Sequence, residues 1–480
     1  MTHSNALPLC VDLDGTLVRT DTLIESLLEL IKRRPLAALL VPFWLFKGKA
    51  GFKSEVAARV SLPPATLPYR DGFVPWLREQ ARARPVYLAT AAHHSIAERI
   101  AQHVGCFTGV IATQSLNLSA ENKAAALVQR FGERQFDYAG NAADDLPVWR
   151  RARKAIVVGA SGSVTQRARA VAEVEREFDP PRTGQALIWT TLWTWIRALR
   201  VYQWVKNLLV FVAPIAAHTL FEPPVLSSSV AAFLAFCLAA SGVYLINDLL
   251  DLASDRQHPR KRLRPFAQGT LSLSTGFLVA LALIGSSFLI GARLNPMFLL
   301  VLSIYLVLTL LYAFWLKRVM FVDAATLASL YTLRLVAGTA AVEMGLSFWL
   351  LGVCVYGFLS LALLKRYSEL VMLRANGGGL AGGRGYRGED EPIVRTIGVA
   401  AGLIASLVMA LYIDSSASHT LYARPDYLWA LVVLMTLGVG HIWMKAGRGA
   451  VHDDPIVFLV QDRFSLLLLA VGILFVALAS

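Results

Sequence analysis

The hydrophobic positions divide the chain into two parts with different patterns. Residues up to about 182 have the polar content of an ordinary cytosolic domain, with short apolar runs of strand length that end in polar residues. After Trp189 the chain consists mostly of apolar stretches of about twenty residues, the length that crosses the roughly 30 Å hydrocarbon layer of a membrane. We therefore predict two domains, residues 1–182 and residues 183–480, joined near Pro180–Pro181.

Nine apolar stretches predict an all-α, nine-helix transmembrane bundle in the second domain. They are residues 203–221, 226–249, 275–292, 296–316, 320–341, 346–364, 393–413, 426–444 and 463–479. The loops after the even-numbered stretches hold sixteen Lys and Arg, whereas the loops after the first, third, fifth and seventh hold only Arg293 and Arg424. The positive-inside rule then places the even loops and the N-terminal domain in the cytoplasm. The first residues lack a signal peptide pattern, so we expect a multi-pass protein of the inner (cytoplasmic) membrane.

Composition and charge support a membrane protein. Hydrophobic residues make up 56% of the chain and charged residues 16%, which is too apolar for a soluble protein of this size. The net charge of +13 does not point to nucleic acid, because the basic residues cluster in short loops between apolar stretches. The glycine-rich residues 376–388 lack the pattern of a phosphate-binding loop, and we predict a flexible connector there.

Three aspartates at the cytoplasmic end of the second stretch are the main candidate for chemistry. Asp248, Asp251 and Asp255 have the spacing i, i+3, i+7, which places them on one face of a helix. Carboxylates gathered there need a cation, and oxygen-only ligands together with phosphate oxygens suit Mg²⁺. His258, Lys261 and Arg264 follow closely and can bind further phosphate oxygens. The alternative is a solvated helix end with mixed charges.

The pattern N-D-x-x-D-x-x-x-D on this stretch resembles the first aspartate-rich motif of the UbiA-type membrane prenyltransferases, and the resemblance covers residues 190–480. It implies that the aspartates hold Mg²⁺ on the diphosphate of a donor substrate. Four segments are similar to one branch, the decaprenyl-phosphate phosphoribosyltransferases: Gln203–Asn207, His258–Pro265, Tyr312–Lys317 before Asp323, and Lys365–Leu370. That branch transfers a 5-phosphoribosyl group from phosphoribosyl diphosphate to a polyprenyl phosphate.

The resemblance implies a set of substrate-binding residues, with one departure from the wider family. The set is Lys206, Asn207, Asn247, His258, Lys261, Arg264, Tyr312, Lys317, Lys365, Arg366, Tyr367 and Glu369. Aromatic prenyltransferases carry a second D-x-x-x-D motif after the sixth helix, where this chain has K-R-Y-S-E-L. The alternatives are a prenyltransferase for an aromatic or lipid acceptor and, from another class, a transporter. Asp323 and Arg334 are interpreted either as structural anchors or as ligands, and a homo-oligomer is compatible with the sequence.

The N-terminal domain carries four elements similar to the motifs of the HAD (haloacid dehalogenase-like) phosphohydrolases. They are D-x-D-G-T after an apolar strand, a strand ending in Thr90, Lys123 at the start of a helix, and Gly140-Asn141 before two acids. The resemblance covers residues 7–178 and implies a Rossmann-like α/β fold with a small helical cap. It implies Asp12 as nucleophile, Asp14 as general acid/base, and Thr90 and Lys123 as phosphate ligands. Mg²⁺ is implied at Asp12, Asp14 and either Asp144 or Asp145, and the site is a candidate for removing the 5-phosphate.

Two features of this domain leave alternatives open. Asn141 stands where the HAD pattern usually has an aspartate, so the phosphatase site is either active or slow and vestigial. The run Leu36–Phe46 is too short to cross a membrane. We favour a core helix of the cap for this run, and the alternative is a contact with the membrane surface that brings in a lipid-linked substrate.

Overall fold

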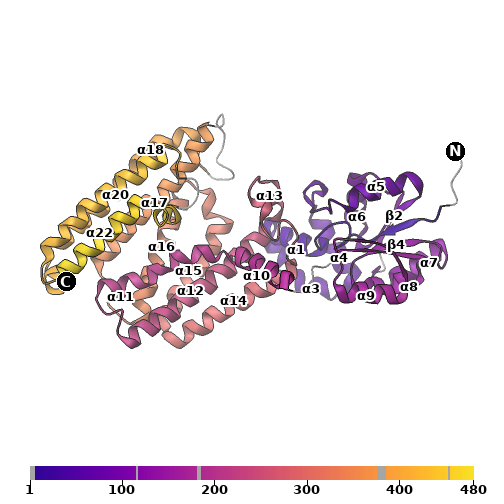
Figure 1. Ribbon diagram of the computed structural model, residues 1–480, viewed down its shortest axis with the longest axis horizontal. Coiled ribbons are helices and arrows are strands. Elements are labelled where there is room, and N and C mark those ends of the chain that lie inside the picture. Colours follow the sequence, from indigo (N-terminus) through magenta and orange to yellow (C-terminus); the bar gives the residue numbers. More distant parts are fainter. Residues whose placement is uncertain (1–5, 115–116, 181–184, 376–384, 452–454) are drawn as a thin grey trace. The chain divides into compact units, whose positions relative to one another are not determined.

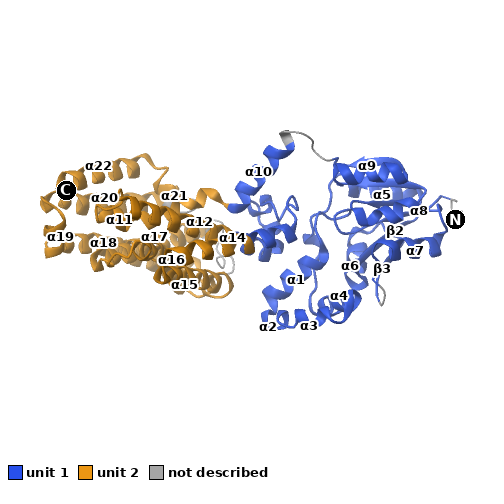
Figure 2. Cartoon of the chain, turned by 90° about the horizontal axis from the view of Figure 1, so that it is seen from below, with its two compact units in different colours: residues 1–199, 244–280 blue, residues 200–243, 281–480 orange. Residues whose placement is uncertain are grey.

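The computed structural model describes residues 6–114, 117–180, 185–375, 385–451 and 455–480. The chain forms two compact units, shown in different colours in Figure 2. Unit 1 contains residues 1–199 and 244–280, and unit 2 contains residues 200–243 and 281–480. The aspartate-rich segment therefore belongs to the same compact unit as the N-terminal domain. Most of the glycine-rich segment, residues 376–384, lies outside the described residues.

The N-terminal domain is built on a six-stranded parallel sheet in the order β3-β2-β1-β4-β5-β6 (Figure 1). Its strands are β1 (Leu9–Val11), β2 (Val86–His93), β3 (Gly109–Thr113), β4 (Asp137–Gly140), β5 (Lys154–Val158) and β6 (Glu173–Phe178). In the centre, Leu9 of β1 lies beside Val86 of β2 and Asp137 of β4. The carboxyl ends of parallel strands meet at one edge of a sheet, which is where such folds bind ligands. The predicted α/β fold is confirmed.

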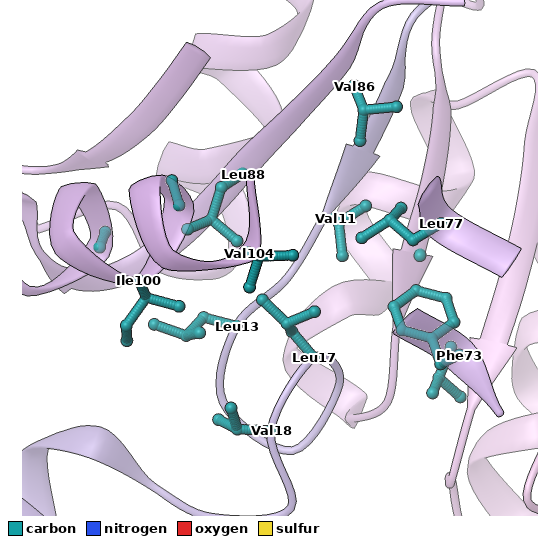
Figure 3. Packing of buried hydrophobic residues seen from close by; sticks show 14 of the residues in the cluster. Val11, Leu13, Leu17, Val18, Phe73, Leu77, Val86, Leu88, Ile100 and Val104 are labelled. Atoms are coloured by element: carbon teal, nitrogen blue, oxygen red, sulfur yellow. The ribbon is translucent and has the colours of Figure 1, made fainter. Parts of the chain in front are cut away.

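Helices cover both faces of this sheet, because successive residues of a strand point to opposite sides. On one face α5 (Phe73–Ala83) and α6 (His94–Val104) pack against Leu9 and Val11. Figure 3 shows Phe73, Leu77, Ile100 and Val104 around the residues that follow β1. On the other face α7 (Ala120–Phe131), α8 (Leu146–Arg151) and α9 (Gly162–Val171) pack against Cys10, Tyr138 and Val157.

A small helical cap follows the first strand, as predicted. It contains α1 (Thr22–Arg33), α2 (Pro35–Ala38), α3 (Val41–Leu45), α4 (Gly48–Arg59) and the 3-10 turn η1 (Pro64–Thr66). Asp21 caps α1, since its carboxylate accepts hydrogen bonds from the amides of Leu23 and Ile24, both at 2.9 Å. The cap has its own small core, formed by Leu30, Trp44, Phe52, Val56, Val60 and Leu62.

The rest of the described chain is helical. It contains α10 (Gln185–Leu199), η3 (Val201–Phe211), α11 (Val212–Ala216), α12 (Pro223–Leu250), α13 (Leu252–Gln257), η4 (Lys261–Leu263), α14 (Leu273–Leu294), α15 (Pro296–Phe314), η5 (Leu316–Arg318), α16 (Val322–Ala341), α17 (Phe348–Ala375), η6 (Gly388–Asp390), α18 (Glu391–Ile413), α19 (Ser416–Leu421), η7 (Pro425–Leu428), α20 (Trp429–Gly447), α21 (Pro455–Leu459) and α22 (Arg463–Ala479). In unit 2, buried residues of α12, α15 and α16 form one core, and residues of α17, α18 and α20 form a second. The prediction of an all-α second domain is confirmed.

The number of membrane spans differs from the prediction. Among the described residues, six helices are long and apolar enough to cross a membrane: residues 223–250, 273–294, 296–314, 348–372, 388–413 and 425–447. The first and last predicted spans correspond to shorter apolar helices, residues 201–216 and 463–479. The fifth is a helix of sufficient length, α16, but Asp323 and Arg334 lower its hydropathy. Nine spans are therefore not confirmed, although a multi-pass membrane protein is.

Candidate functional site

The loop after β1 places the first candidate aspartates at the edge of the sheet. The amide of Asp12 donates to the carbonyl of Ala139 at 2.9 Å, which joins the end of β1 to β4. Gly15 has φ of +76°, and a Cβ there would overlap the side chain of Asn141. Glycine is needed at this position for both reasons. The D-x-D-G-T loop is thereby held against the residue that follows β4.

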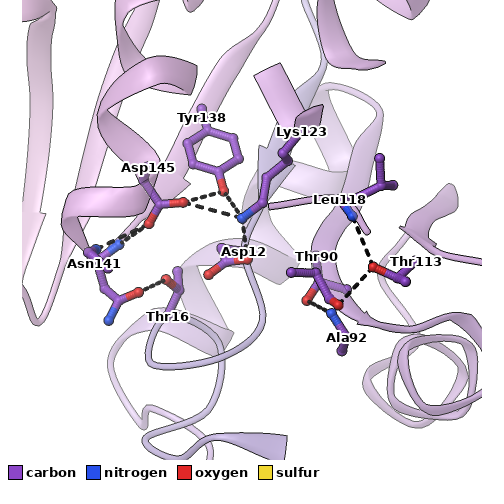
Figure 4. Close-up of polar contacts among 12 residues, drawn as sticks. Asp12, Thr16, Thr90, Ala92, Thr113, Leu118, Lys123, Tyr138, Asn141 and Asp145 are labelled. Carbon is purple, nitrogen blue, oxygen red and sulfur yellow. Dashed lines mark hydrogen bonds and ion pairs between the residues drawn. The ribbon is translucent and has the colours of Figure 1, made fainter. Parts of the chain in front are cut away.

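Lys123, on α7, joins three polar side chains into one buried cluster (Figure 4). Its ammonium lies 2.8 Å from an oxygen of Asp12, 2.8 Å from the Tyr138 hydroxyl and 3.3 Å from an oxygen of Asp145. The Tyr138 hydroxyl in turn donates to Asp145 at 2.8 Å. The structure thus brings together Asp12, Lys123 and Asp145, all predicted from the sequence. Tyr138 was not predicted, although strand alternation places it on the same side of β4 as Gly140.

The two acids after β4 have different environments. Asp145 is buried, and its second oxygen accepts from the amides of Asn141 at 2.9 Å and Ala142 at 3.1 Å. Asp144 is exposed. The amide oxygen of Asn141 accepts from the Thr16 hydroxyl at 3.1 Å, so Asn141 is built into the loop. Of the two acids, Asp145 is therefore the one in contact with the Asp12 cluster.

Thr90 and Asp14 complete this site. The Thr90 side chain is buried, and its hydroxyl accepts from the amide of Ala92 at 3.0 Å. Asp14 accepts from the amide of Thr22, the first residue of α1, at 2.8 Å. Asp14 therefore connects the edge of the sheet that carries Asp12 with the cap.

The electrostatics of the site call for a cation. Burial raises the pKa of Asp12 to about 6, although Lys123 acts in the opposite direction. Burial, followed by the nearby charges of Asp21 and Asp12, raises the pKa of Asp14 to about 8. Burial alone would lower the pKa of Lys123, but the carboxylates of Asp12 and Asp145 outweigh it and raise that pKa. The Lys123 ammonium thus faces two carboxylates, Asp12 and Asp145, which a divalent cation would stabilise further in their charged form.

The donors present suit Mg²⁺ with additional ligands. The carboxylates of Asp12, Asp14 and Asp145 and the amide oxygen of Asn141 are oxygen ligands, the kind that Mg²⁺ prefers. Within the described ranges, no three Asp, Glu, His or Cys side chains already form a group that could hold a metal ion. A Mg²⁺ ion here would therefore also take a backbone carbonyl, water or phosphate oxygens as ligands.

The aspartate-rich segment is helical but interrupted once. α12 ends at Leu250 and α13 begins at Leu252, with Asp251 between them. The amide of Asp251 still bonds to the carbonyl of Asn247 at 2.9 Å, and that of Asp255 to Asp251 at 2.8 Å. The helical hydrogen bonds therefore continue through the break at Asp251.

Two of the three aspartates share one cation. The Arg264 guanidinium donates to Asp248 at 3.1 Å and to Asp255 at 2.6 Å, and both carboxylates are buried. Burial raises the pKa of Asp255, and Arg264 opposes that shift. The predicted convergence of carboxylates is present for this pair, and oxygen-only donors beside a base fit Mg²⁺ bound to a diphosphate.

Of the remaining predicted residues of this segment, His258 has local partners. The imidazole Nδ1 of His258 accepts from the amides of Arg260 at 3.2 Å and Lys261 at 3.3 Å, which stabilises the turn. The side chains of His258 and Lys261 are exposed. His258 therefore has a structural role in the turn, and its role in substrate binding stays a prediction.

The cap helix α1 contributes two residues that sequence analysis missed. Lys32 donates to Asp251 at 2.9 Å. The Glu25 carboxylate holds the Arg256 guanidinium through two contacts, at 3.0 and 2.6 Å, and both side chains are buried. Arg256 also donates to the carbonyls of Thr66 at 3.3 Å and Ala267 at 3.0 Å. Within unit 1 the cap is thus bonded directly to the aspartate-rich segment.

In unit 2, a buried arginine gathers three of the predicted residues. Arg366 lies 2.5 Å from Asp323, 2.7 Å from Glu369 and 3.0 Å from the Tyr312 hydroxyl. Asp323 also accepts from the Tyr386 hydroxyl at 2.6 Å. Asp323 and Arg366 therefore have protein partners, as expected of structural anchors, while a ligand role for Arg366 stays a prediction.

A second buried arginine supports the start of the helical domain. Arg334 donates to the Asn207 side chain at 2.8 Å and to the Tyr305 hydroxyl at 3.0 Å. Asn207 donates to the Cys237 thiol at 3.2 Å. The Lys206 side chain is buried, with its ammonium 5.7 Å from the centre of the Tyr331 ring.

Three predicted residues of unit 2 differ in their environment. Tyr367 is buried in an apolar cluster, with its ring centre 5.4 Å from that of Trp443. Lys317 and Lys365 are partly exposed. Tyr367 therefore contributes to packing, and the roles of the two lysines remain predictions.

The chain is similar to known proteins over both parts. The model of the UbiA prenyltransferase family matches residues 208–467. An uncharacterized protein of Sinorhizobium fredii, y4nM, is 36% identical over 96% of this chain and 88% of its own length. The decaprenyl-phosphate phosphoribosyltransferase of Corynebacterium glutamicum is 35% identical over 49% of this chain and 72% of its own length.

Solved structures resemble each part at low sequence identity. A UbiA homolog from Archaeoglobus fulgidus, bound to DMAPP and Mg²⁺, has a TM-score of 0.47 and 16% identity, covering 59% of this chain and 99% of that one. A HAD family hydrolase from Salmonella enterica resembles the N-terminal part, with a TM-score of 0.27 and 15% identity over 37% of this chain and 68% of that one. The family model spans more than half of the sequence and includes the aspartate-rich segment. The chain therefore belongs to the UbiA prenyltransferase family.

Proposed function

We propose that this protein transfers a 5-phosphoribosyl group from phosphoribosyl diphosphate to a polyprenyl phosphate, with Mg²⁺ as cofactor. The observation that carries the proposal is the pair of buried carboxylates, Asp248 and Asp255, held on one guanidinium of Arg264. Such a group of acids and a base suits a metal-bound diphosphate. The relative named decaprenyl-phosphate phosphoribosyltransferase supports this choice of donor and acceptor.

The residues near K-R-Y-S-E-L also favour a phosphorylated sugar donor. Where a second aspartate motif would bind another metal-bound phosphate, the chain has a buried Arg366 paired with Asp323 and one remaining acid, Glu369. A cation in this position suits the 5-phosphate of the donor better than it suits a hydrocarbon tail. Lys365, beside Arg366, is proposed to share this role.

The charges suggest how the transfer would proceed. Departure of diphosphate from the anomeric carbon leaves an oxocarbenium-like centre and builds negative charge on the leaving group. Mg²⁺, when bound to Asp248, Asp251 and Asp255, supplies electrostatic stabilisation of that charge. Lys261 and Arg264 are proposed to stabilise it further. The acceptor is already an anionic phosphate, so positioning matters more than a general base.

An apolar groove supports a lipid acceptor. A groove of about 290 Å³ lies between α16 and α17, lined by Ala325, Ala328, Thr332, Leu333, Val336 and Val355, among others. Small and branched apolar side chains can contact a hydrocarbon chain without leaving polar groups unpaired. We propose that this groove receives part of the polyprenyl tail.

We further propose that the N-terminal domain removes the 5-phosphate from the lipid product. Asp12 would attack the phosphorus, forming an aspartyl-phosphate as the bond to the ribose oxygen breaks and Asp14 gives that oxygen a proton. Water, deprotonated by Asp14, would then cleave the aspartyl-phosphate and regenerate Asp12. Lys123, 2.8 Å from Asp12, is placed to neutralise charge next to the nucleophile. This step requires the domain to lie in the cytoplasm with the transferase residues, as the charge bias of the loops predicts.

An assay of donor choice tests the transferase proposal. Purified protein is given Mg²⁺ with either phosphoribosyl diphosphate and decaprenyl phosphate, or a prenyl diphosphate and 4-hydroxybenzoate. We expect product only from the first pair, and EDTA should abolish it. Product from the second pair alone would favour the other function that the family name suggests, prenyl transfer to an aromatic acceptor.

A further inference from the structure

The short helices α2 and α3 of the cap expose an unusual number of large apolar side chains. Leu36, Leu39, Phe43 and Phe46 are 80%, 70%, 66% and 89% exposed, and Leu40 and Leu45 are exposed as well. We call residues 35–46 the apolar lobe. Contiguous apolar surface of this kind marks an interaction site more often than an accident of packing.

The lobe is not the core helix that we favoured from the sequence. Trp44 is its one buried large side chain, and it packs into the cap core with Leu30 and Val56. The guanidinium of Arg59 lies 4.5 Å from the centre of the Trp44 ring. Ala37, Ala38 and Val41 also pack against this core and are partly buried. Trp44 therefore anchors the lobe. The interpretation as a core helix is wrong because the leucines and phenylalanines of the run are exposed.

The charges around the lobe indicate its partner. Basic residues precede and follow it: Lys32, Arg33, Arg34, Lys47, Lys49 and Lys53. Three of them form ion pairs with protein carboxylates, Lys32 with Asp251, Arg33 with Glu29 and Lys47 with Glu55. The attraction to anionic lipid therefore depends mainly on Arg34 and Lys49. No acidic residue occurs between Glu29 and Glu55. Arg34 and Lys49 are exposed, beside the apolar side chains. A short apolar segment bordered by basic groups suits the boundary between the headgroups and acyl chains of an anionic bilayer.

We propose that the apolar lobe is a membrane-docking surface, which inserts its leucines and phenylalanines into the interface of a bilayer containing anionic lipids. Among the described residues, six helices are long and apolar enough to cross a membrane, so a bilayer is the surface expected near the cap. A protein partner would need an apolar surface for six large side chains and, around it, acidic or polar groups for the basic residues. An anionic bilayer has both, because its acyl chains are apolar and its headgroups are charged. Docking does not require the phosphatase to be active.

The position of the lobe in the cap gives docking a consequence. The lobe leads directly into α4, where Lys53 donates to the carbonyl of Ala91 at 2.6 Å and to Asn117 at 2.7 Å. Ala91 lies in β2, one residue after Thr90, so α4 connects the lobe with the catalytic edge of the sheet. A docked lobe would hold the Asp12 cluster near the surface where a lipid-linked phosphate is found.

Spin labels of the full-length protein in nanodiscs test this proposal. The partly exposed thiols Cys106 and Cys354 are first replaced by Ser and Ala, while Cys10 and Cys237 are buried. The lobe is then labelled through Phe43→Cys, and the exposed Gln135→Cys serves as matched control. Collisions are measured with oxygen, which concentrates in hydrocarbon, and with a nickel chelate, which stays in water. We expect an oxygen-to-nickel ratio about tenfold higher at residue 43 than at residue 135.

The other results overturn the proposal in distinguishable ways. Equal ratios at the two positions would mean that the lobe stays in water. A label at residue 43 protected from both reagents would mean that protein covers the lobe. If the label at residue 43 loses this protection in nanodiscs that hold a single copy of the protein, the covering protein is a second copy of this chain. An unchanged ratio in discs of purely zwitterionic lipid would overturn the role given to the basic residues.

Discussion

At the scale of single residues, the phosphatase-like site depends on which groups are buried together. Asp145 is in contact with Lys123 and Tyr138, while the neighbouring Asp144 is exposed. We predict that Asp145→Asn lowers Mg²⁺-dependent hydrolysis of p-nitrophenyl phosphate by about a hundredfold, in the range of losing a charged group from such a site. Asp144→Asn is the matched control and should change the rate less than about twofold. Equal losses in both variants would contradict this assignment.

Asp14 should give the metal-free domain a characteristic dependence on pH. Its pKa is raised to about 8 in the folded protein. At a pH between the ordinary carboxyl pKa of about 4 and this value, the Asp14 carboxyl therefore binds a proton when the protein folds. The stability it contributes is complete below about pH 4 and is lost as the pH rises through 8. The slope is at most about 1.4 kcal/mol per pH unit, and solvent screening reduces it because Asp14 is partly exposed.

Thermal unfolding in EDTA measures this effect. The N-terminal transition should move to lower temperature as the pH rises from 5 to 8, and Asp14→Asn should reduce the slope. A wild-type transition that is independent of pH in this range would show that the Asp14 carboxyl is not shifted.

At the scale of elements, helix α1 connects the cap with the aspartate-rich segment. Lys32 holds Asp251, which we assign to Mg²⁺ binding, and this pair is partly exposed. Exposed pairs contribute about 0.2–1 kcal/mol, so Lys32→Met should lower the half-saturating Mg²⁺ concentration of the transfer reaction by a factor of about 1.4 to 5. Arg33→Met, which removes the neighbouring cation paired with Glu29, should leave that concentration unchanged. A weaker Mg²⁺ response in Lys32→Met would mean that Lys32 positions Asp251 instead of competing for it.

The elements also show what the sequence could and could not predict. The parallel sheet and the Asp12, Lys123 and Asp145 cluster were predictable, because each motif lies at the end of a strand or the start of a helix. The pairs of Lys32 and Glu25 with the aspartate-rich segment were not, since the partners are 219 and 231 residues apart. A charged residue on a helix gives no local sign that its partner is so distant.

The errors in the helical assignments have a physical cause too. An apolar run in the sequence does not show whether its side chains are buried by the rest of the protein. For this reason the interpretation of residues 35–46 as a core helix was wrong. The first predicted span divides at Phe211 into η3 and α11, which a hydropathy window does not detect. The 17-residue α22 likewise falls short of the length expected of a span.

At the scale of the whole molecule, two different phosphate chemistries are proposed for one chain. The family assignment rests on residues 208–467, while Asp12 and its partners lie in a separate α/β domain. Bonding between α1 and α13 within unit 1 means that the two are not independent in structure. The proposed functions nevertheless use different nucleophiles and different acids, so they can be separated by mutation.

Mass spectrometry of the lipid products tests the central claim most directly. Wild type, Asp248→Asn and Asp12→Asn are each incubated with phosphoribosyl diphosphate, decaprenyl phosphate and Mg²⁺. We predict ribosylated lipid without the 5-phosphate from the wild type, the 5-phosphorylated lipid from Asp12→Asn, and no ribosylated lipid from Asp248→Asn. Phosphorylated lipid from the wild type would remove the phosphatase role alone. Absence of any ribosylated lipid from the wild type, or normal transfer by Asp248→Asn, would contradict the account.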